Sequence, residues 1–214
     1  MSTPTQTLVR LKAGPTTTMA PGPHDHLTKP LAILHASCIE KDHSVVDFLP
    51  PLDIPLMTRW WQSRIDEVGA GTREIIAVVE QAPAPDGDDD DDDGSGSQEA
   101  FVAAVVMVSF PVVQTAPMRG LVQKLLVSPK RRRQGLARKV MAEMERAALE
   151  RGKWHLTLDA EVGAPSELVY PRLGYEDVGV VPSCEISPED GRLISCRWFW
   201  KDLRKTNLIG QVQE

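Results

Sequence analysis

The chain has 214 residues, of which 42% are hydrophobic, and this is enough to build the core of one domain. The formal net charge is −6, but the six consecutive aspartates at 88–93 account for all of it, which argues against general nucleic-acid binding. No stretch approaches the ~20 apolar residues of a membrane span, and the N-terminus lacks the apolar region of a secretory signal. We therefore expect a cytoplasmic protein, with the nucleus as the alternative.

The cysteine pattern predicts neither disulfides nor a metal site. Cys38, Cys184 and Cys196 are odd in number and irregularly spaced, so they form no disulfide framework and no zinc signature. His24 and His26 form a pair, but no third ligand lies near them in the sequence. The expected metal content is none.

The first half of the chain predicts strands around two helices. Residues 8–11 are a candidate first strand, and 14–30 are rich in Pro, Thr and Gly, which is typical of a loop. Helices are expected at 31–40 and at 55–68, the second with Asp53 as its N-cap. A further strand is expected at 73–80.

The second half predicts further strands and one strong helix. Helical spacing at 134–151 places seven apolar residues on one face, and Gly152 ends the helix. These apolar residues are Leu136, Ala137, Val140, Met141, Met144, Ala147 and Ala148. The expected strands are 101–113, which Pro111 interrupts, then 121–127, 155–158, 175–181 and 192–200. Strands and helices in this order predict an α/β or α+β domain around a mixed sheet.

The domain boundaries follow from composition. Residues 1–30 are expected to be a flexible N-terminal segment that contains the candidate first strand. Residues 31–214 are expected to form a single domain. Within it, the Asp-, Gly-, Pro- and Ser-rich stretch 82–98 predicts a disordered acidic loop, because like charges repel and nothing there can be buried.

A basic loop joins the expected strand at 121–127 to the expected helix at 134–151. It runs from Lys130 through three arginines to Gln134 and Gly135. The first backbone N–H groups of a helix have no intrahelical partner, and the helix dipole adds partial positive charge there. The loop therefore predicts a site for a phosphate or pyrophosphate, which Gly135 lets approach the backbone closely. The alternative for the basic residues alone is a nuclear-localisation-like run.

Two motifs carry a family resemblance. The order Arg132-Arg133-Gln134-Gly135-Leu136-Ala137 fits Arg/Gln-x-x-Gly-x-Gly/Ala, and here the chain resembles the GNAT superfamily of N-acetyltransferases. Downstream, Tyr170, Gly174 and Tyr175 match the aromatic-x-x-x-Gly-aromatic signature of that family. Gly174 is also a suitable helix C-cap, and Pro171 predicts a short or distorted helix around Tyr170.

Further stretches resemble the tabtoxin-resistance type of this family, which acetylates the amine of an amino-acid-like antibiotic. They are residues 44–53, 122–125, 158–161 and 188–192, within a similarity that is clearest from 120 to 203. One position departs from the pattern, because Leu121 stands where that type carries a second acidic residue. A mechanism with two carboxylates at that place is therefore not expected to transfer.

The resemblance implies an α/β (α+β) fold with a central mixed, mostly antiparallel sheet, splayed between its fourth and fifth strands and flanked by helices. The pantetheine arm of the co-substrate acetyl-CoA would lie in the gap between 121–127 and 155–158. Backbone N–H groups around Leu126 and Val127 would polarise the acetyl carbonyl. The residues expected to bind acetyl-CoA are Leu125, Leu126, Val127, Arg132, Arg133, Gln134, Gly135, Leu136 and Ala137.

Two side chains are the candidate catalytic groups. The resemblance places Tyr170 near the acetyl-CoA sulfur, where its phenol can act as the acid; the alternative is a core aromatic that covers the cofactor. Asp159 is the candidate base, because a carboxylate that ends a strand beside the gap can accept the amine proton, and partial burial would raise its pKa. The alternative for Asp159 is a turn or cap residue, and Glu161 is the reserve base.

The sequence thus predicts an acetyl-CoA-dependent N-acetyltransferase that transfers the acetyl group directly to a primary amine of a small, amino-acid-like molecule. One alternative keeps the enzyme and makes the acceptor a protein lysine, as in a histone tail, with the acidic loop attracting a basic peptide. A second alternative is a catalytically inactive module that binds acyl-CoA. The expected partners are a small-molecule amine, no nucleic acid and no membrane, and the expected state is a monomer or homodimer.

Overall fold

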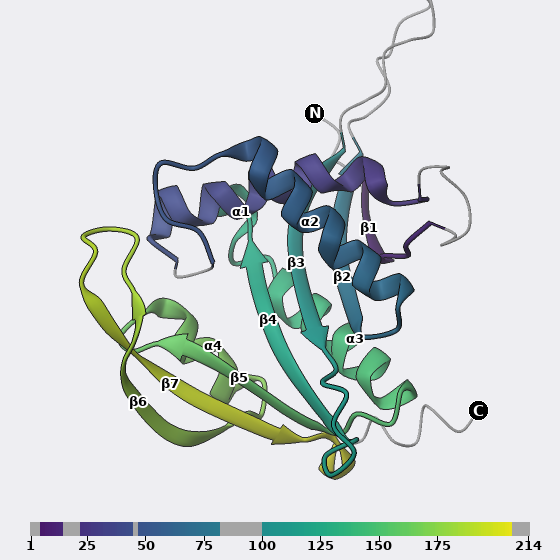
Figure 1. Cartoon of the computed structure of the whole chain (residues 1–214), viewed down its shortest axis with the longest axis vertical. Coiled ribbons are helices and arrows are strands. Elements are labelled where there is room, and N and C mark those ends of the chain that lie inside the picture. Colours follow the sequence, from purple (N-terminus) through teal and green to yellow (C-terminus); the bar gives the residue numbers. More distant parts are fainter. Residues whose placement is uncertain (1–4, 15–21, 45–46, 82–99, 207–214) are drawn as a thin grey trace, which may run out of the picture.

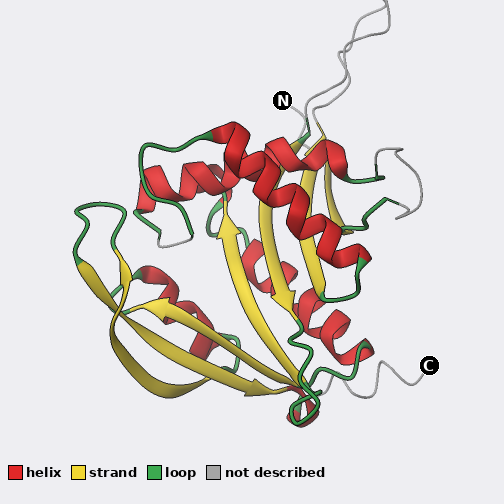
Figure 2. Cartoon of the chain, viewed as in Figure 1, coloured by secondary structure: helices red, strands yellow, loops and turns green. Residues whose placement is uncertain are grey.

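The computed structural model describes residues 5–14, 22–44, 47–81 and 100–206. A seven-stranded sheet in the order β1-β2-β3-β4-β5-β7-β6 forms the middle layer, with α1 and α2 on one face and α3 on the other (Figures 1 and 2). The strands are β1 Thr5–Arg10, β2 Arg73–Gln81, β3 Phe101–Ser109, β4 Arg119–Val127, β5 His155–Glu161, β6 Glu176–Ile186 and β7 Leu193–Asp202. The helices are α1 Thr28–Asp42, α2 Ile54–Gly69, α3 Leu136–Glu150 and α4 Val169–Arg172.

The sheet divides into two parts that separate between β4 and β5. Strands β1 to β4 are antiparallel neighbours, and β5, β7 and β6 form a second antiparallel group. Among the described strands, the only parallel pair is β4 with β5. It has just three partnered positions, from Arg119–His155 to Leu121–Thr157. Beyond them the two strands diverge (Figure 1). The predicted mixed sheet, splayed between its fourth and fifth strands, is confirmed.

Helix α3 and the α1–α2 pair bury opposite faces of the sheet. Alternate residues of β2 and β3 point to each side, so these strands are buried on both faces, as expected for central strands of a layered sheet. The predicted apolar face of α3 packs on one side, where all of its members are buried except Ala137, which is half-buried. Trp61 and Ile65 of α2 are fully buried on the other side.

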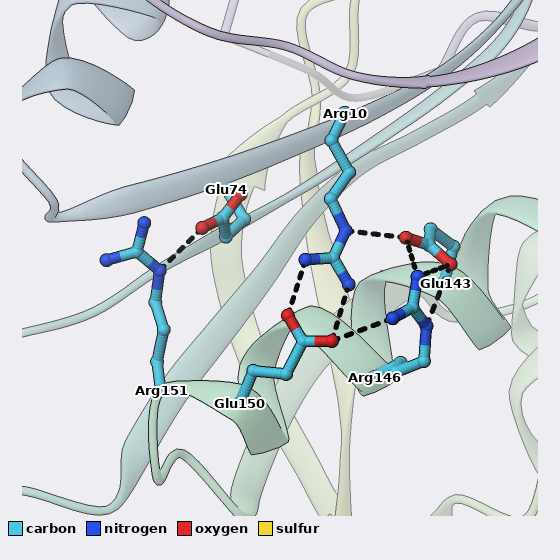
Figure 3. A network of polar contacts seen from close by, with 6 residues as sticks. All are labelled: Arg10, Glu74, Glu143, Arg146, Glu150 and Arg151. Atoms are coloured by element: carbon cyan, nitrogen blue, oxygen red, sulfur yellow. Dashed lines mark hydrogen bonds and ion pairs between the residues drawn. The ribbon is translucent and has the colours of Figure 1, made fainter. Parts of the chain in front are cut away.

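Ion pairs fasten α3 to the sheet (Figure 3). Arg10 of β1 reaches Glu143 at 2.5 Å and Glu150 at 2.6 Å, and Arg146 bridges the same two carboxylates at 2.7 Å each. At the helix end, Arg151 donates to Glu74 of β2 at 2.5 Å. Because α3 begins at the basic loop, these contacts also fix the position of that loop.

One expectation about the N-terminal half needs correction. Residues 28–30, expected within a loop, form the first turn of α1, with Thr28 and Pro30 buried. Proline is compatible with a first turn because N–H groups there need no intrahelical partner. The structure also has a strand at β1, close to the predicted 8–11. The acidic stretch 82–98 lies outside the described residues.

Several strand ends also differ from the prediction, and β6 runs to Ile186 rather than to 181. β3 ends at Ser109, before Pro111, rather than at 113. β5 continues to Glu161, so Asp159 lies within the strand and does not end it, because Ala160 and Glu161 pair with Arg197 and Cys196 of β7. In the described ranges, no helix combines the length and the apolar character needed to cross a membrane.

The predicted N-cap of α2 is confirmed, since the Asp53 side chain accepts a hydrogen bond from Leu56 N at 2.9 Å. Replacing Asp53 with Ala should lower the free energy of unfolding by about 1 kcal/mol, because one first-turn donor loses its acceptor. Urea denaturation measures the change, with Asp66→Ala, an exposed aspartate of the same helix, as the matched control. Equal midpoints for the two variants would contradict the capping role.

Candidate active site

The basic loop presents free backbone donors to solvent. After the short 3-10 turn Pro129–Arg131, Arg133 and Gly135 adopt positive φ angles of 61° and 76°, and Gly135 becomes the N-cap of α3. A Cβ atom built on Gly135 would meet nothing within 4 Å. The backbone N–H groups of 132–135 donate to no described residue. The loop therefore has the open backbone and the unpaired donors that a phosphate group needs.

The arginines of this loop differ in their partners. Arg131 donates to Glu80 at 2.8 Å, and Arg132 pairs with Asp42 at the end of α1, with its Nη1 at 2.6 Å from Oδ1. Neither Lys130 nor Arg133 forms an ion pair with any carboxylate in the described ranges. A phosphate at the loop would therefore meet two unpaired cations, and it would compete with Asp42 for Arg132.

The edge of β4 that borders the gap is open. From Val122 onward no strand of the described part of the chain pairs with β4 on the β5 side, so this edge offers unpaired backbone groups. β4 has a bulge in this stretch. Between the pairs Val105–Leu126 and Met107–Gln123, two residues of β4 stand opposite one residue of β3. Lys124 in the bulge has a φ of 55°. Leu125 and Val127 pack against the α3-side core, and Leu126 is buried on the opposite side.

Tyr170 lies on the other side of the gap. It belongs to the four-residue helix α4, whose shortness confirms the prediction made from Pro171, and the turn closes at Gly174 with a φ of 81°. The ring is 7% exposed and packs 5.6 Å from the Phe199 ring. Burial, with a smaller effect from the charge of Asp159, raises the pKa of Tyr170 far above its usual range. The hydroxyl therefore stays protonated at neutral pH and can donate.

Asp159 lies on the face of β5 that borders the gap. Leu156, Leu158 and Ala160 alternate with it and are buried against α3, so Asp159 and Glu161 point to the opposite face. Burial raises the pKa of Asp159, and the positive charge of Lys124 partly offsets this. Burial also raises the pKa of Glu161. A carboxylate with a raised pKa is a better proton acceptor near neutral pH.

Three further residues that the sequence did not single out surround Asp159. Glu185 of β6 and Cys196 of β7 place donor atoms that lie, together with those of Asp159, within 4.8 Å of one another. Lys124 extends from the β4 bulge to Asp47, with 2.8 Å between Nζ and Oδ2, and its side chain is only 8% exposed. Of these three, only Lys124 lies in a stretch that the sequence marks by resemblance, residues 122–125.

Two cavities lie near these residues. One of about 330 Å³ lies between the α1–α2 loop and the β6–β7 end, and Asp47, Phe48, Cys184 and Glu185 are among its lining residues. The other, of about 380 Å³, lies between α1, the start of β3 and Pro129. Neither cavity is lined by Asp159 or Tyr170. The smaller one is lined by Glu185, whose carboxylate lies within 4.8 Å of that of Asp159, so it is the better candidate for an acceptor.

Comparison with known proteins agrees with this geometry. Over most of its length the fold of the chain is that of solved acetyltransferases. Residues 95–185 match the family model described as an acetyltransferase (GNAT) domain.

Three solved structures illustrate the likeness of the fold. A presumed acetyltransferase from Acinetobacter baylyi is 13% identical, with a TM-score of 0.66 and coverage of 96% of both chains. YncA from Salmonella typhimurium, a presumed acetyltransferase solved with its cofactor acetyl-CoA, is 12% identical, with a TM-score of 0.63 over 93% of this chain and 94% of its own. The ribosomal-protein-alanine N-acetyltransferase from Brucella melitensis is 15% identical, with a TM-score of 0.59 over 84% and 96%.

Proposed function

We propose that this protein is an N-acetyltransferase that transfers the acetyl group of acetyl-CoA directly to a primary amine of a small molecule, as its resemblance to the tabtoxin-resistance type implies. One observation carries the proposal. A helix N-terminus with unpaired N–H groups stands at the end of β4, where the gap between β4 and β5 opens. The half-buried Asp159 carboxylate lies on β5 beside that gap, and the buried Tyr170 phenol is close enough for the charge of Asp159 to act on it.

The residues present fit acetyl-CoA. The open space at Gly135 and the unpaired N–H groups of 132–135 suit a pyrophosphate, with Lys130 and Arg133 as nearby cations. The open edge of β4 along Leu125, Leu126 and Val127 suits an amide-bearing arm, which can pair with it as an added strand does. When bound, acetyl-CoA supplies an acetyl thioester. The Salmonella structure with acetyl-CoA shows that the fold can accommodate it.

The side chains of this protein would do the proton chemistry. Asp159 accepts a proton from the ammonium form of the acceptor, which leaves a neutral amine with a free lone pair. Tyr170 keeps its proton at neutral pH and is the donor for a departing thiolate. No covalent bond to the protein is needed, which agrees with the buried Cys38, whose pKa burial raises to about 11.

The cavity favours a small acceptor. Its volume of about 330 Å³ is at the lower end of the usual range for small-molecule sites, about 300–1,000 Å³. It is lined by Phe48 and Leu49 together with the carboxylates of Asp47 and Glu185, so it combines apolar surface with acceptors for an ammonium group.

The test is calorimetric titration of acetyl-CoA into the wild type and into Gly135→Glu. The glutamate places a bulky anion at the loop, and we expect it to weaken binding at least about tenfold, through repulsion of the pyrophosphate and loss of space. Gly152→Glu is the matched control, because Gly152 also has a positive φ of 70° and no neighbour within 4 Å, at the opposite end of α3.

The outcomes separate clearly. Saturable binding that Gly135→Glu loses and Gly152→Glu keeps would support the cofactor site and justify a screen of small amines against lysine peptides. A folded wild type that does not bind acetyl-CoA would overturn the proposed function. Equal losses in both glycine variants would point to strain in α3 rather than to a phosphate site.

A further inference from the structure

A second carboxylate lies close to Asp159, on the part of β6 that extends beyond the predicted strand 175–181. Glu185 lies on β6 and pairs with Ile194 of β7, and its carboxylate lies within 4.8 Å of the Asp159 carboxylate and the Cys196 sulfur. The Cys196 thiol, 1% exposed, donates to Glu185 Oε2 at 3.5 Å. The two acidic groups come from different strands on one side of the gap.

A bulge in β6 places Glu185 there. Between the pairs Val181–Cys196 and Glu185–Ile194, β6 advances by four residues while β7 advances by two. Regular pairing would put Ser183 opposite Ile194, whereas the two extra residues bring Glu185 to that position. Pro182 fits the bulge because it has no N–H to donate, and Ser183 there has a φ of 51°. Bulges of this kind redirect side chains next to active sites.

The charges around this pair are unbalanced. The positive charge of Lys124 acts on both carboxylates, but Lys124 already pairs with Asp47 at 2.8 Å. The charges of Asp159 and Asp47 raise the pKa of Glu185, and the charge of Lys124 opposes them. Two half-buried carboxylates so close together are unfavourable when both are ionised, so either one of them keeps a proton or a cation lies between them, and a cation with several N–H donors can pair with both.

The cavity connects this pair to solvent. Glu185 lines the cavity of about 330 Å³ between the α1–α2 loop and the β6–β7 end, so a small molecule there would reach Glu185. A primary ammonium group has three N–H donors on one atom, which lets it donate to both carboxylates at once.

We propose that Glu185 is an acceptor-binding residue, which with Asp159 holds the ammonium group of the acceptor before proton transfer. The proposal rests on the proposed function for the identity of the reaction, but it concerns a binding site that can be measured without turnover. It assigns the acceptor to organic primary ammonium ions and gives Glu185 a role in recognition, while Asp159 takes the proton.

The test is a titration of the wild type, Glu185→Gln and Glu176→Gln with n-butylammonium chloride at constant ionic strength, followed by NMR amide shifts. Glu176 is an exposed carboxylate at the other end of β6 and is the matched control. Tetramethylammonium, which has the charge but no N–H donor, is the control ligand. We expect Glu185→Gln to weaken n-butylammonium binding about tenfold, Glu185→Asp to restore part of it, and Glu176→Gln to leave it unchanged.

Each other result overturns the proposal. Binding that survives Glu185→Gln removes Glu185 from the site. Equal shifts with tetramethylammonium indicate general charge attraction, and no saturable binding by the wild type, with or without acetyl-CoA, shows that the two carboxylates hold no ammonium. Binding of acetyl-CoA, measured on the same samples, shows independently whether the proposed function stands, so the two failures are distinguishable.

Discussion

Replacing Asp159 with Asn should lower kcat/KM for an amine acceptor by about 10²- to 10⁴-fold, the usual contribution of a general base. The amide keeps the shape of the side chain but cannot accept the proton. Acetyl-CoA binding should stay unchanged, because Asp159 belongs to β5 and the phosphate loop follows β4. Steady-state kinetics and calorimetry on one preparation measure both effects. Asp177→Asn, an exposed aspartate of β6 that pairs with Arg197, is the control and should keep full activity.

The pH profile gives a second readout. Burial raises the pKa of Asp159 above the ordinary value of about 3.9, so the base is lost by protonation at a higher pH than for an exposed aspartate. In the wild type kcat/KM should fall as pH decreases through this raised pKa, and in Asp159→Asn the fall should disappear. If kcat/KM of the variant still falls at low pH as in the wild type, the base is another group, and Glu161 is the next candidate.

Asp159→Asn should lose activity but keep or gain thermal stability at neutral pH. A carboxyl with a raised folded-state pKa favours the folded state most below its unfolded pKa, and this stabilisation is lost as pH rises through the folded pKa. At neutral pH the ionised, desolvated Asp159 therefore costs free energy, which the neutral amide removes. Equal or higher thermal stability of the variant would exclude unfolding as the cause of lost activity. Active sites often keep such destabilising groups for function.

Local sequence patterns were sufficient for most of the fold. The apolar spacing of α3, the N-cap of α2 and the proline in α4 are properties of neighbouring residues, and the structure confirms each of them. The loop at Gly135 was also recognisable, because its order of residues is contiguous. The prediction of a loop that includes residues 28–30 was wrong because Pro30 is compatible with the first turn of a helix, which it occupies in α1.

The acceptor side of the site could not be predicted in the same way. Glu185 faces Asp159 only because a bulge shifts β6 by two residues, and no periodic pattern reports a bulge. Arg132 pairs with Asp42, which is 90 residues away in the sequence, and Lys124 pairs with Asp47. Such pairs depend on how helices and strands pack, so they become visible only with the tertiary structure.

A second large effect is expected on the free energy of unfolding, at the buried ion pair between Lys201 and Glu145. Lys201 Nζ lies 2.8 Å from both carboxylate oxygens of Glu145 and 2.8 Å from the carbonyl of Leu173, with side chains 11% and 6% exposed for Lys201 and Glu145. It joins β7 to α3 and to the turn that ends α4. Burial raises the pKa of Glu145 and Lys201 opposes that rise, so the lysine keeps the carboxyl closer to its ionised form.

Lys201→Met should lower the free energy of unfolding by about 3–5 kcal/mol at neutral pH, because it leaves Glu145 buried without a counter-charge. Chemical denaturation measures the loss. The double variant Glu145→Leu/Lys201→Met should recover most of it, since both charges are then gone from an apolar surrounding. The loss should also shrink as pH falls, because protonation of Glu145 removes the unpaired charge. A single-variant loss below about 1 kcal/mol would show that water reaches the pair and that it behaves as a surface ion pair does.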